Sequence, residues 1–328
     1  MEDVQGHPKK LLYGMKQRYK NITGILARLT AGFFSILLFI SCGNEEAVSY
    51  PGDTTKSGTI NISADESFKP IIDSQIKVFE SSFPNAKIIT HYKPEAECLK
   101  DLNNDSIRMI IVTRPLTPGE ENQLIDKLKF RPVQGKMAYD AIAVIINTAA
   151  QDSIFDMTDI RSLVKGTSGY KYKVVMDGLS ATSTVRFVMD SLLKGNPFGA
   201  NVMAATTSEG VINYVEKNKD AIGFVGVSWI GNKEDGNLLS FSQKVRVASL
   251  QCTICEKVAY VKPYQANIAM RRYPLVRGLQ YILKENYKGL GSGFVNFLIN
   301  ERGQLIFRTA YLWPAQMSFQ TRNSIIKQ

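Results

Sequence analysis

Histidine is almost absent from this sequence, and its scarcity excludes several classes of enzyme. The chain contains two histidines, His7 and His91, and the second lies in an alternating segment that is typical of a β-strand. Serine-based catalytic triads and most catalytic zinc sites need histidine. The chain also lacks the Gly-x-Ser-x-Gly elbow of hydrolases and the phosphate loop of nucleotide-binding enzymes. We therefore expect a protein that binds a ligand without catalysis and without a metal or cofactor.

Cysteine is also scarce, and its four positions do not complete a metal site. Cys252 and Cys255 have the spacing of half a zinc site, but no second pair or histidine cluster supplies the remaining ligands. We expect Cys98, Cys252 and Cys255 to be structural or incidental. A redox pair at Cys252 and Cys255 is the alternative if the compartment is oxidising.

The N-terminal apolar run is too short for a comfortable membrane span. It extends over 13 residues from Leu29 to Ser41 and follows several lysines and arginines, which predicts a signal peptide over residues 1–41. The run ends in Phe39-Ile-Ser-Cys-Gly, which resembles a bacterial lipobox, so Cys42 is the expected lipidation site. A short anchor that is never cleaved is the alternative.

Residues 42–57 are polar and contain Pro51-Gly52, which predicts a flexible tether. We therefore expect a periplasmic or cell-surface lipoprotein, held at the membrane through Cys42. Whether translation starts at Met1 or Met15, and which membrane leaflet carries the anchor, stay open.

The charge of the chain is positive but not patterned for nucleic acid. The whole chain carries +10, and residues 1–41 hold six basic against two acidic residues, which leaves +6 for the rest. No arginine-rich run or basic stripe with interleaved aromatics is present, so nucleic acid is not an expected partner. A small anion or a membrane surface fits this charge equally well.

From Gly58 onward the sequence alternates between strand-like and helix-like segments, which predicts an α/β fold with largely parallel sheets. The chain that remains after the signal peptide exceeds one comfortable core, so two lobes are expected. The predicted first lobe comprises residues 58–138 and 258–328, and the second comprises residues 139–257. Predicted strands cover residues 59–63, 87–92, 109–113, 138–147, 171–176 and 221–225, and predicted helices follow Ser67, Thr117, Thr158, Ser183 and Ser208.

The segment from Ser180 to Phe187 is a polar loop that leads into an amphipathic helix. Thr182 or Ser183 is a natural N-cap, and the first turn of such a helix has free N–H groups and a partial positive charge. Arg186 lies off the apolar stripe and adds a planar set of donors, so the loop suits a small tetrahedral oxyanion. An ordinary helix cap beside a solvated arginine is the alternative.

Two further polar loops follow predicted strands in the same way. Residues 63–67 follow the first strand, with Ser67 as a plausible cap for the next helix, and residues 113–115 follow a later strand. In open α/β sheets, ligands bind beyond the carboxyl ends of the strands. The three loops are therefore expected to converge on a cleft between the lobes.

From Gly58 to Pro314 the chain resembles the substrate-binding proteins of phosphate ABC transporters. The order and spacing of the matching segments carry this resemblance, since each is weak alone. They are Thr113-Arg-Pro-Leu with Glu120, Asp140 to Asn147, Ser180 to Phe187, Ala221 to Val225, Tyr273 to Arg277, and Phe294 to Leu298 with Gly303-Gln304. The resemblance implies a two-lobed periplasmic-binding-protein fold of type II, with a hinge and an interlobe cleft.

The resemblance also implies the residues that hold phosphate: Ser67, Phe68, Thr113, Arg114, Ser183, Thr184 and Arg186. Three departures from the family pattern are visible. The third loop lacks the family's glycines, and its arginine, Arg186, lies one residue later than in the family. Arg114 stands where some members have an aspartate that accepts a proton from phosphate. Asp65 or Glu66 is a substitute acceptor. Asp140 is expected to be a buried hinge residue rather than a ligand.

The predicted function is therefore that of an extracytoplasmic receptor, which captures inorganic phosphate and delivers it to the permease subunits of an ABC transporter. Two alternatives stay open at this point. The site binds another tetrahedral oxyanion such as sulfate or molybdate, or the fold serves as a surface module for sensing or adhesion.

Overall fold

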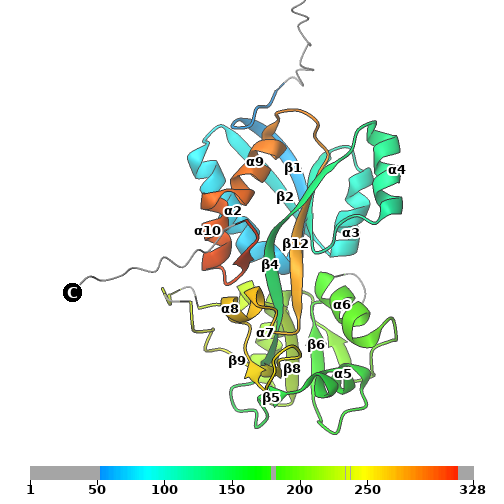
Figure 1. Ribbon diagram of the computed structural model, residues 1–328, viewed down its shortest axis with the longest axis vertical. Coiled ribbons are helices and arrows are strands. Elements are labelled where there is room, and N and C mark those ends of the chain that lie inside the picture. Colours follow the sequence, from blue (N-terminus) through cyan, green and yellow to red (C-terminus); the bar gives the residue numbers. More distant parts are fainter. Residues whose placement is uncertain (1–51, 179–181, 233, 237, 317–328) are drawn as a thin grey trace, which may run out of the picture. The chain divides into compact units, whose positions relative to one another are not determined.

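The computed structural model describes residues 52–178, 182–232, 234–236 and 238–316 (Figure 1). The predicted signal peptide, the lipidation site Cys42 and residues 42–51 of the predicted tether lie outside these residues. Within them, no helix has both the length and the apolar character needed to cross a membrane.

The first lobe is built on a central strand with a parallel neighbour on each side. These strands are β1 (Gly58–Asp65), β2 (Ala86–Lys93) and β3 (Ile107–Val112). Figure 1 shows helices on both sides of this sheet: α2 (Lys69–Ser82), α9 (Leu290–Ile299) and α10 (Glu301–Thr309) on one side, α3 (Glu95–Lys100) and α4 (Pro118–Leu128) on the other. The apolar residues of β1 are buried between these layers, because helices cover both faces of the sheet.

The second lobe repeats this plan around three shorter parallel strands. They are β6 (Lys173–Met176), β7 (Val202–Ala204) and β8 (Ala221–Gly226). Its helices are α5 (Met157–Lys165), α6 (Ser183–Val188), which continues as a π-helical turn over Met189–Leu193, and α7 (Ser208–Lys217). A separate small sheet contains β5 (Ile154–Phe155), β10 (Ser249–Gln251) and β11 (Tyr260–Val261).

Two long strands connect the lobes. β4 (Val133–Ile146) pairs with β12 (Val276–Leu283) along its first part and with β8 along its last five residues. Both pairings are antiparallel. β4 leaves the first lobe and β12 returns to it, so these two strands run in opposite directions. The sheets are therefore largely parallel inside each lobe, as predicted, with antiparallel pairs where the chain crosses and where β12 pairs with β3.

The predicted strands and helices are all present, and most of their starts are correct. The capping box at Thr117 is confirmed, since its hydroxyl accepts from Glu120 N and the Glu120 carboxylate accepts from Thr117 N. Thr182 is confirmed as the cap of α6, because its hydroxyl accepts from Val185 N. Ser67 is not the cap of α2, which begins after Phe68 without a side-chain cap. The capping group is instead Asp65, which accepts from Ser67 N in the short 3-10 turn before α2.

Two glycines lie in the first turn of helix α9. Helix α9 begins at Leu290, so Gly291 and Gly293 belong to its first turn. A Cβ at Gly293 would lie 2.0 Å from the carbonyl oxygen of Thr55, and one at Gly291 would lie 2.3 Å from a Glu285 carboxylate oxygen. These glycines therefore let the start of α9 pack against the chain that enters the fold.

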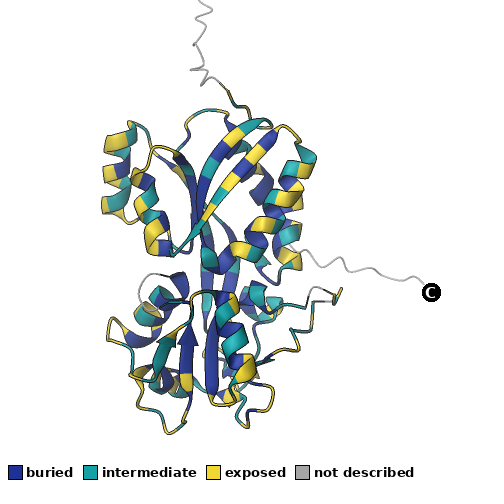
Figure 2. Ribbon diagram, turned by 180° about the vertical axis from the view of Figure 1, so that it is seen from behind, coloured by how far each residue is buried: buried dark blue, intermediate teal, exposed yellow. Residues whose placement is uncertain are grey.

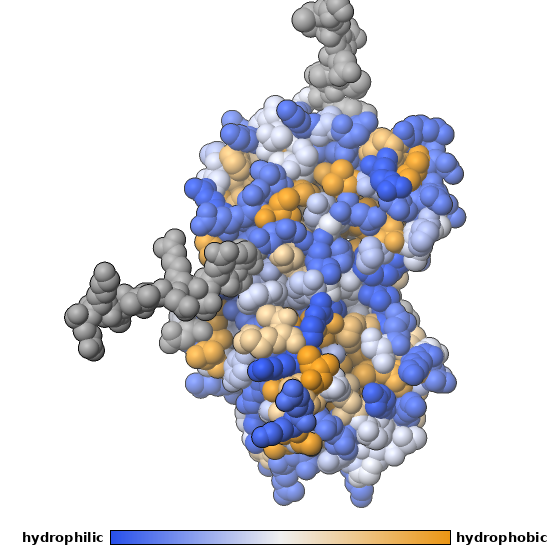
Figure 3. Space-filling model, viewed as in Figure 1, coloured by the Kyte–Doolittle hydropathy of each residue, from blue (hydrophilic) through white to orange (hydrophobic). Residues whose placement is uncertain are grey.

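Buried apolar residues fill both lobes and continue along the crossing strands (Figure 2). The face in Figure 3 is mostly hydrophilic, with apolar residues in small groups. Cys252 and Cys255 form a disulfide beside the small sheet, with their Cα atoms 5.6 Å apart. Cys98 is a free, buried thiol, and burial raises its pKa. The disulfide fits both a structural role and the redox pair that was left open for Cys252 and Cys255.

Candidate functional site

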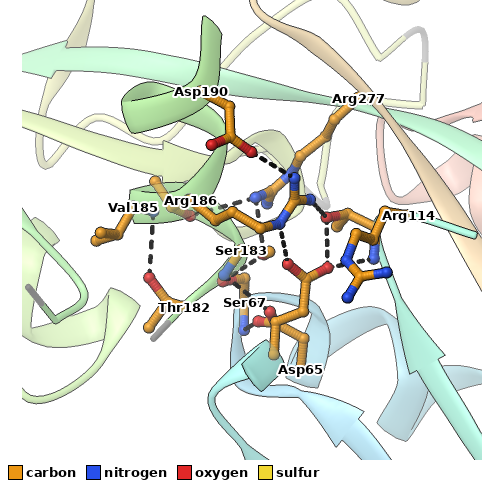
Figure 4. Close-up of polar contacts among 12 residues, drawn as sticks. Asp65, Ser67, Arg114, Thr182, Ser183, Val185, Arg186, Asp190 and Arg277 are labelled. Carbon is orange, nitrogen blue, oxygen red and sulfur yellow. Dashed lines mark hydrogen bonds and ion pairs between the residues drawn. The ribbon is translucent and has the colours of Figure 1, made fainter. Parts of the chain in front are cut away.

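The first and third predicted loops meet directly at the junction between the lobes. Ser67 lies in the turn after β1, Ser183 begins α6, and their hydroxyl oxygens are 3.5 Å apart (Figure 4). Both side chains and that of Thr184 are fully buried. Two helix starts from opposite lobes therefore present hydroxyl and backbone donors to one enclosed position.

The carboxylate of Asp65 connects the backbones of these two loops. One oxygen accepts from Ser67 N at 2.8 Å, and the other accepts from Ser183 N at 3.0 Å. Burial, together with the negative charge of Glu95, raises the pKa of Asp65 to about 6, against the lowering effect of Arg277. The Asp65 carboxylate thus accepts from two backbone N–H groups of the kind that bind an oxyanion at a helix start.

A second carboxylate, that of Asp177 at the end of β6, gathers the hydroxyls of the junction. One oxygen accepts from Ser67 at 3.0 Å and from Ser208 at 2.9 Å, and the other accepts from Thr182 at 3.0 Å. Asp177 was not among the site residues expected from the sequence. Its signal was its place immediately after a predicted strand, where ligand-binding loops begin.

Glu66 extends this acidic group toward the start of α7. Its carboxylate accepts from the hydroxyl of Ser208 at 3.2 Å and from Ser208 N at 3.4 Å. Burial and the nearby Asp177 charge raise the pKa of Glu66 to about 7. Both acceptors named from the sequence, Asp65 and Glu66, therefore lie at the junction.

The second loop reaches the third through a buried glutamate. Glu95 accepts from Thr113 N at 2.7 Å and from the Thr113 hydroxyl at 2.6 Å, while its other oxygen accepts from Arg186 Nε at 2.5 Å. Arg186 Nη2 also donates to the Thr113 hydroxyl at 2.6 Å. Burial alone would raise the pKa of Glu95, but the bonds and charge of Arg186 and Thr113 lower it. Thr113 and Arg186 are therefore brought together across the lobes by Glu95.

Arg114 is engaged elsewhere. Its guanidinium makes two bonds of 2.7 Å with the Glu120 carboxylate, and that pairing lowers the pKa of Glu120 to about 2. Arg114 also lines a surface pocket with Leu99 and Gln123, between α3 and α4. Of the three loops, the second thus contributes Thr113 to the junction while Arg114 faces its own lobe.

The crossing strands contribute a buried ion pair between Arg277 and Asp140, of which only Asp140 was expected from the sequence to be buried. Arg277 of β12 donates from Nε to Asp140 of β4 at 2.8 Å. Its Nη1 donates to the hydroxyls of Ser183 at 2.9 Å and Thr184 at 3.3 Å, and its guanidinium lies 4.8 Å from the centre of the Phe68 ring. Asp140 is fully buried, as expected of a hinge residue.

The junction therefore combines many donors with several carboxylates. Among the described residues, no group of three or more histidine, cysteine or acidic side chains is placed to hold a metal ion. Several donors of the two helix starts, namely Ser67 N, Ser183 N and the hydroxyls of Ser67 and Thr182, are paired with carboxylates of the chain itself. The lobes are therefore joined at the junction by bonds between these donors and the carboxylates of Asp65 and Asp177.

The family model for the PBP superfamily domain matches residues 49–302. The chain belongs to the PBP superfamily. A search of curated proteins gave no match. This member of the superfamily shares its two-lobed fold with several solved structures, and at identities below one fifth this likeness establishes the fold alone.

Three of these structures come from different bacteria. One is a Clostridium perfringens protein with bound phosphate, which is assigned as a phosphate ABC transporter substrate-binding protein. It is 18% identical to this chain, with a TM-score of 0.65, and the match covers 79% of this chain and 100% of that one. An ABC-type phosphate transport receptor from Vibrio cholerae is 17% identical, with a TM-score of 0.59 and coverage of 77% and 99%. A Planctomyces limnophilus protein assigned as a phosphate-binding protein is 18% identical, with a TM-score of 0.53 and coverage of 79% and 93%.

Proposed function

We propose that this protein is an extracytoplasmic receptor that binds inorganic phosphate between its lobes and delivers it to an ABC-type permease. The observation that carries the proposal is the meeting of two helix starts, from β1 and from β6, at Ser67 and Ser183. Their N–H and hydroxyl groups form the kind of enclosed donor set that replaces the hydration shell of a small oxyanion. The solved structures with the same fold and phosphate in their descriptions support the same ligand.

The proposed ligand contacts are the hydroxyls of Ser67, Ser183 and Thr184 and the backbone of Phe68. Thr113 and Arg186 contribute through the contact between the lobes, and Arg114 supports the second loop through Glu120. Phosphate binding requires Asp65 and Asp177 to give up donors that they now hold. A protonated phosphate offers O–H groups to these carboxylates, whereas fully ionised sulfate or molybdate offers none. The acidic junction therefore favours phosphate over those oxyanions.

Isothermal titration of the protein without residues 1–42 tests the proposal. Phosphate is expected to bind with one site per chain and no turnover, and sulfate and molybdate are expected to bind at least 100-fold more weakly. Stronger heat with sulfate or molybdate would identify a different oxyanion receptor. The absence of heat with all three would favour the surface-module alternative.

We also propose that residues 1–41 are a signal peptide and that Cys42 carries the lipid anchor. The lipobox-like segment Phe39–Gly43 supports this part of the proposal. In cells, wild-type protein is expected in the membrane fraction and to incorporate radiolabelled palmitate. Cys42→Ala should abolish labelling, and labelling that persists would contradict the anchor.

A further inference from the structure

Three arginines lie near the junction, and only one of them has an unused donor there. Arg277 is 4% exposed, and its Nη2 has no hydrogen-bond partner within the described part of the chain. We propose that Arg277 is the arginine that binds the anion, and that Arg186 and Arg114 hold carboxylates of the chain. This inference rests on the proposed function and names the charged group of the same site.

The position of Arg277 suits this role. Its side chain leaves β12 where the chain crosses between the lobes, and Asp140 on β4 fixes it by accepting from Nε. The far edge of the guanidinium then faces the third loop, where Nη1 donates to Ser183 and Thr184 (Figure 4). One arginine is thereby held by the hinge and touches two hydroxyls of the donor set.

The surroundings of Nη2 leave this donor unpaired. Gly226, at the end of β8, contributes no side chain here, and a Cβ on it would lie 3.4 Å from Arg277 Nη2, from Asp140 Oδ2 and from Ser67 O. The Phe68 ring packs against one face of the guanidinium. Buried N–H groups in folded proteins are almost always bonded, so an orphan donor beside a donor-lined junction indicates a missing acceptor.

Arg186 and Arg114 do not offer comparable donors. Arg186 uses Nε, Nη1 and Nη2 for Glu95, Asp190 and Thr113, and Arg114 uses Nη1 and Nη2 for both oxygens of Glu120. Either arginine would have to leave a carboxylate unpaired before it could meet an anion. Arg277 keeps its bond to Asp140 while Nη1 and Nη2 turn from hydroxyls to the ligand.

The charges that face Arg277 come from every element around it. Asp140 pairs with it from β4, Asp65 approaches from the end of β1, and Asp177, just after β6, accepts from the Thr184 hydroxyl. The Arg277 guanidinium therefore lies among three carboxylates. An anion that enters gains a compensating positive charge when it contacts this guanidinium.

Titration of phosphate into a panel of variants tests this assignment. Arg277→Lys keeps the charge beside Asp140 but loses the planar pair of donors, and binding is expected to weaken at least 10-fold. In Arg277→Gln combined with Asp140→Asn, both buried charges are removed together, so the fold is retained and binding should weaken at least 100-fold. Asp140→Asn alone removes the buried carboxylate and keeps Arg277. Arg131→Gln is the matched control, because it removes an arginine at an exposed position. Arg186→Gln and Arg114→Gln should each weaken binding less than Arg277→Lys does.

Each result decides one of the two proposals. Wild-type affinity in a folded Arg277→Lys protein, judged by its thermal melt and circular dichroism, would overturn the role of Arg277 and leave the proposed function intact. A larger loss in Arg186→Gln than in Arg277→Lys would also overturn it. No phosphate binding by the wild-type protein would overturn the proposed function itself, and the inference with it.

Discussion

At the scale of residues, the junction is defined by carboxylates whose partners lie far away in the sequence. Asp65 bonds to Ser183 across 118 positions, and Ser67 bonds to Asp177 across 110. Local patterns predicted the serines, because short polar side chains before a helix are recognisable caps. They could not predict Asp177 or Arg277, since neither stands in a local pattern that names its partner. The hydroxyl donors and the acceptors Asp65 and Glu66 were thus predictable from the sequence, whereas Asp177 and Arg277 were not.

The raised pKa of Asp65 predicts a pH dependence of stability. Its carboxyl titrates near 6 in the folded protein and near 4 when unfolded, so the folded state binds the extra proton in between. This contribution is fully present below pH of about 4 and is lost as the pH rises through about 6, with a size of about 3 kcal/mol at most. Denaturant unfolding at pH 5 and pH 8 should show lower stability at pH 8, and Asp65→Asn should reduce that difference.

Glu66 titrates in the same direction and supplies the remainder of the effect, because its pKa is raised to about 7. Glu120 is a suitable contrast. Its lowered pKa makes its contribution present above pH of about 4.5 and lost as the pH falls through about 2, outside the window compared. An Asp65→Asn protein with the full wild-type difference between pH 5 and pH 8 would contradict the assignment to Asp65.

At the scale of elements, the starts of helices were the features that the sequence predicted best. They also matter most for the site, because its donors lie at helix starts. Capping residues at Thr117 and Thr182 act within three residues of their own position, so the sequence alone identifies them. The start of α2 was harder, because its preceding turn is capped by Asp65 from the strand before it. The prediction of Ser67 as a cap was wrong for that reason. Its hydroxyl points to Asp177 of the other lobe instead.

Helix α6 of the second lobe is held to α3 of the first through Arg186 and Glu95, which predicts energetic coupling between them. Glu95 is buried, so loss of either partner leaves a poorly solvated charge or donor. Denaturant unfolding of Arg186→Gln, Glu95→Gln and the double variant should give a coupling free energy of about 1–3 kcal/mol. A coupling near zero, with both single variants folded, would show that the pair does not stabilise the closed lobes.

The disulfide beside β10 should contribute modestly to stability, because it closes a very short loop. Cys252 and Cys255 are three positions apart, and a loop of this size is worth about 2 kcal/mol in the chain-entropy model. Replacement of both cysteines by serine should lower the free energy of unfolding by about that amount and leave phosphate binding unchanged, since β10 lies in the small sheet away from Ser183. Wild-type protein treated with reductant is the matched control. A loss of phosphate binding in either sample would connect this sheet to the site.

At the scale of the whole molecule, the two-lobed α/β plan followed from the alternation of segments, whereas the contacts between lobes did not. The predicted lobe boundaries at residues 138 and 257 remain a prediction. β11 follows residue 257 yet pairs with β10, which favours a return to the first lobe only at β12. The lobes also contact each other through Trp229, whose Nε1 donates to the carbonyl of Ser67 at 2.7 Å. Sequence periodicity carries no information about such contacts, because they depend on how two finished lobes meet.

Trp229 therefore predicts a fluorescence signal for opening and closing. The chain contains two tryptophans, Trp229 at the junction and Trp313 in β13 (Trp313–Pro314). Movement of the lobes changes the hydrogen bond and the solvent exposure of Trp229, while β13 keeps its pairing with β4. Titration of phosphate into Trp313→Phe should change the emission with the same midpoint as calorimetry, and Trp229→Phe should bind phosphate with little change in emission. A phosphate-dependent change that survives in Trp229→Phe and disappears in Trp313→Phe would place the motion in the first lobe and not at the junction between the lobes.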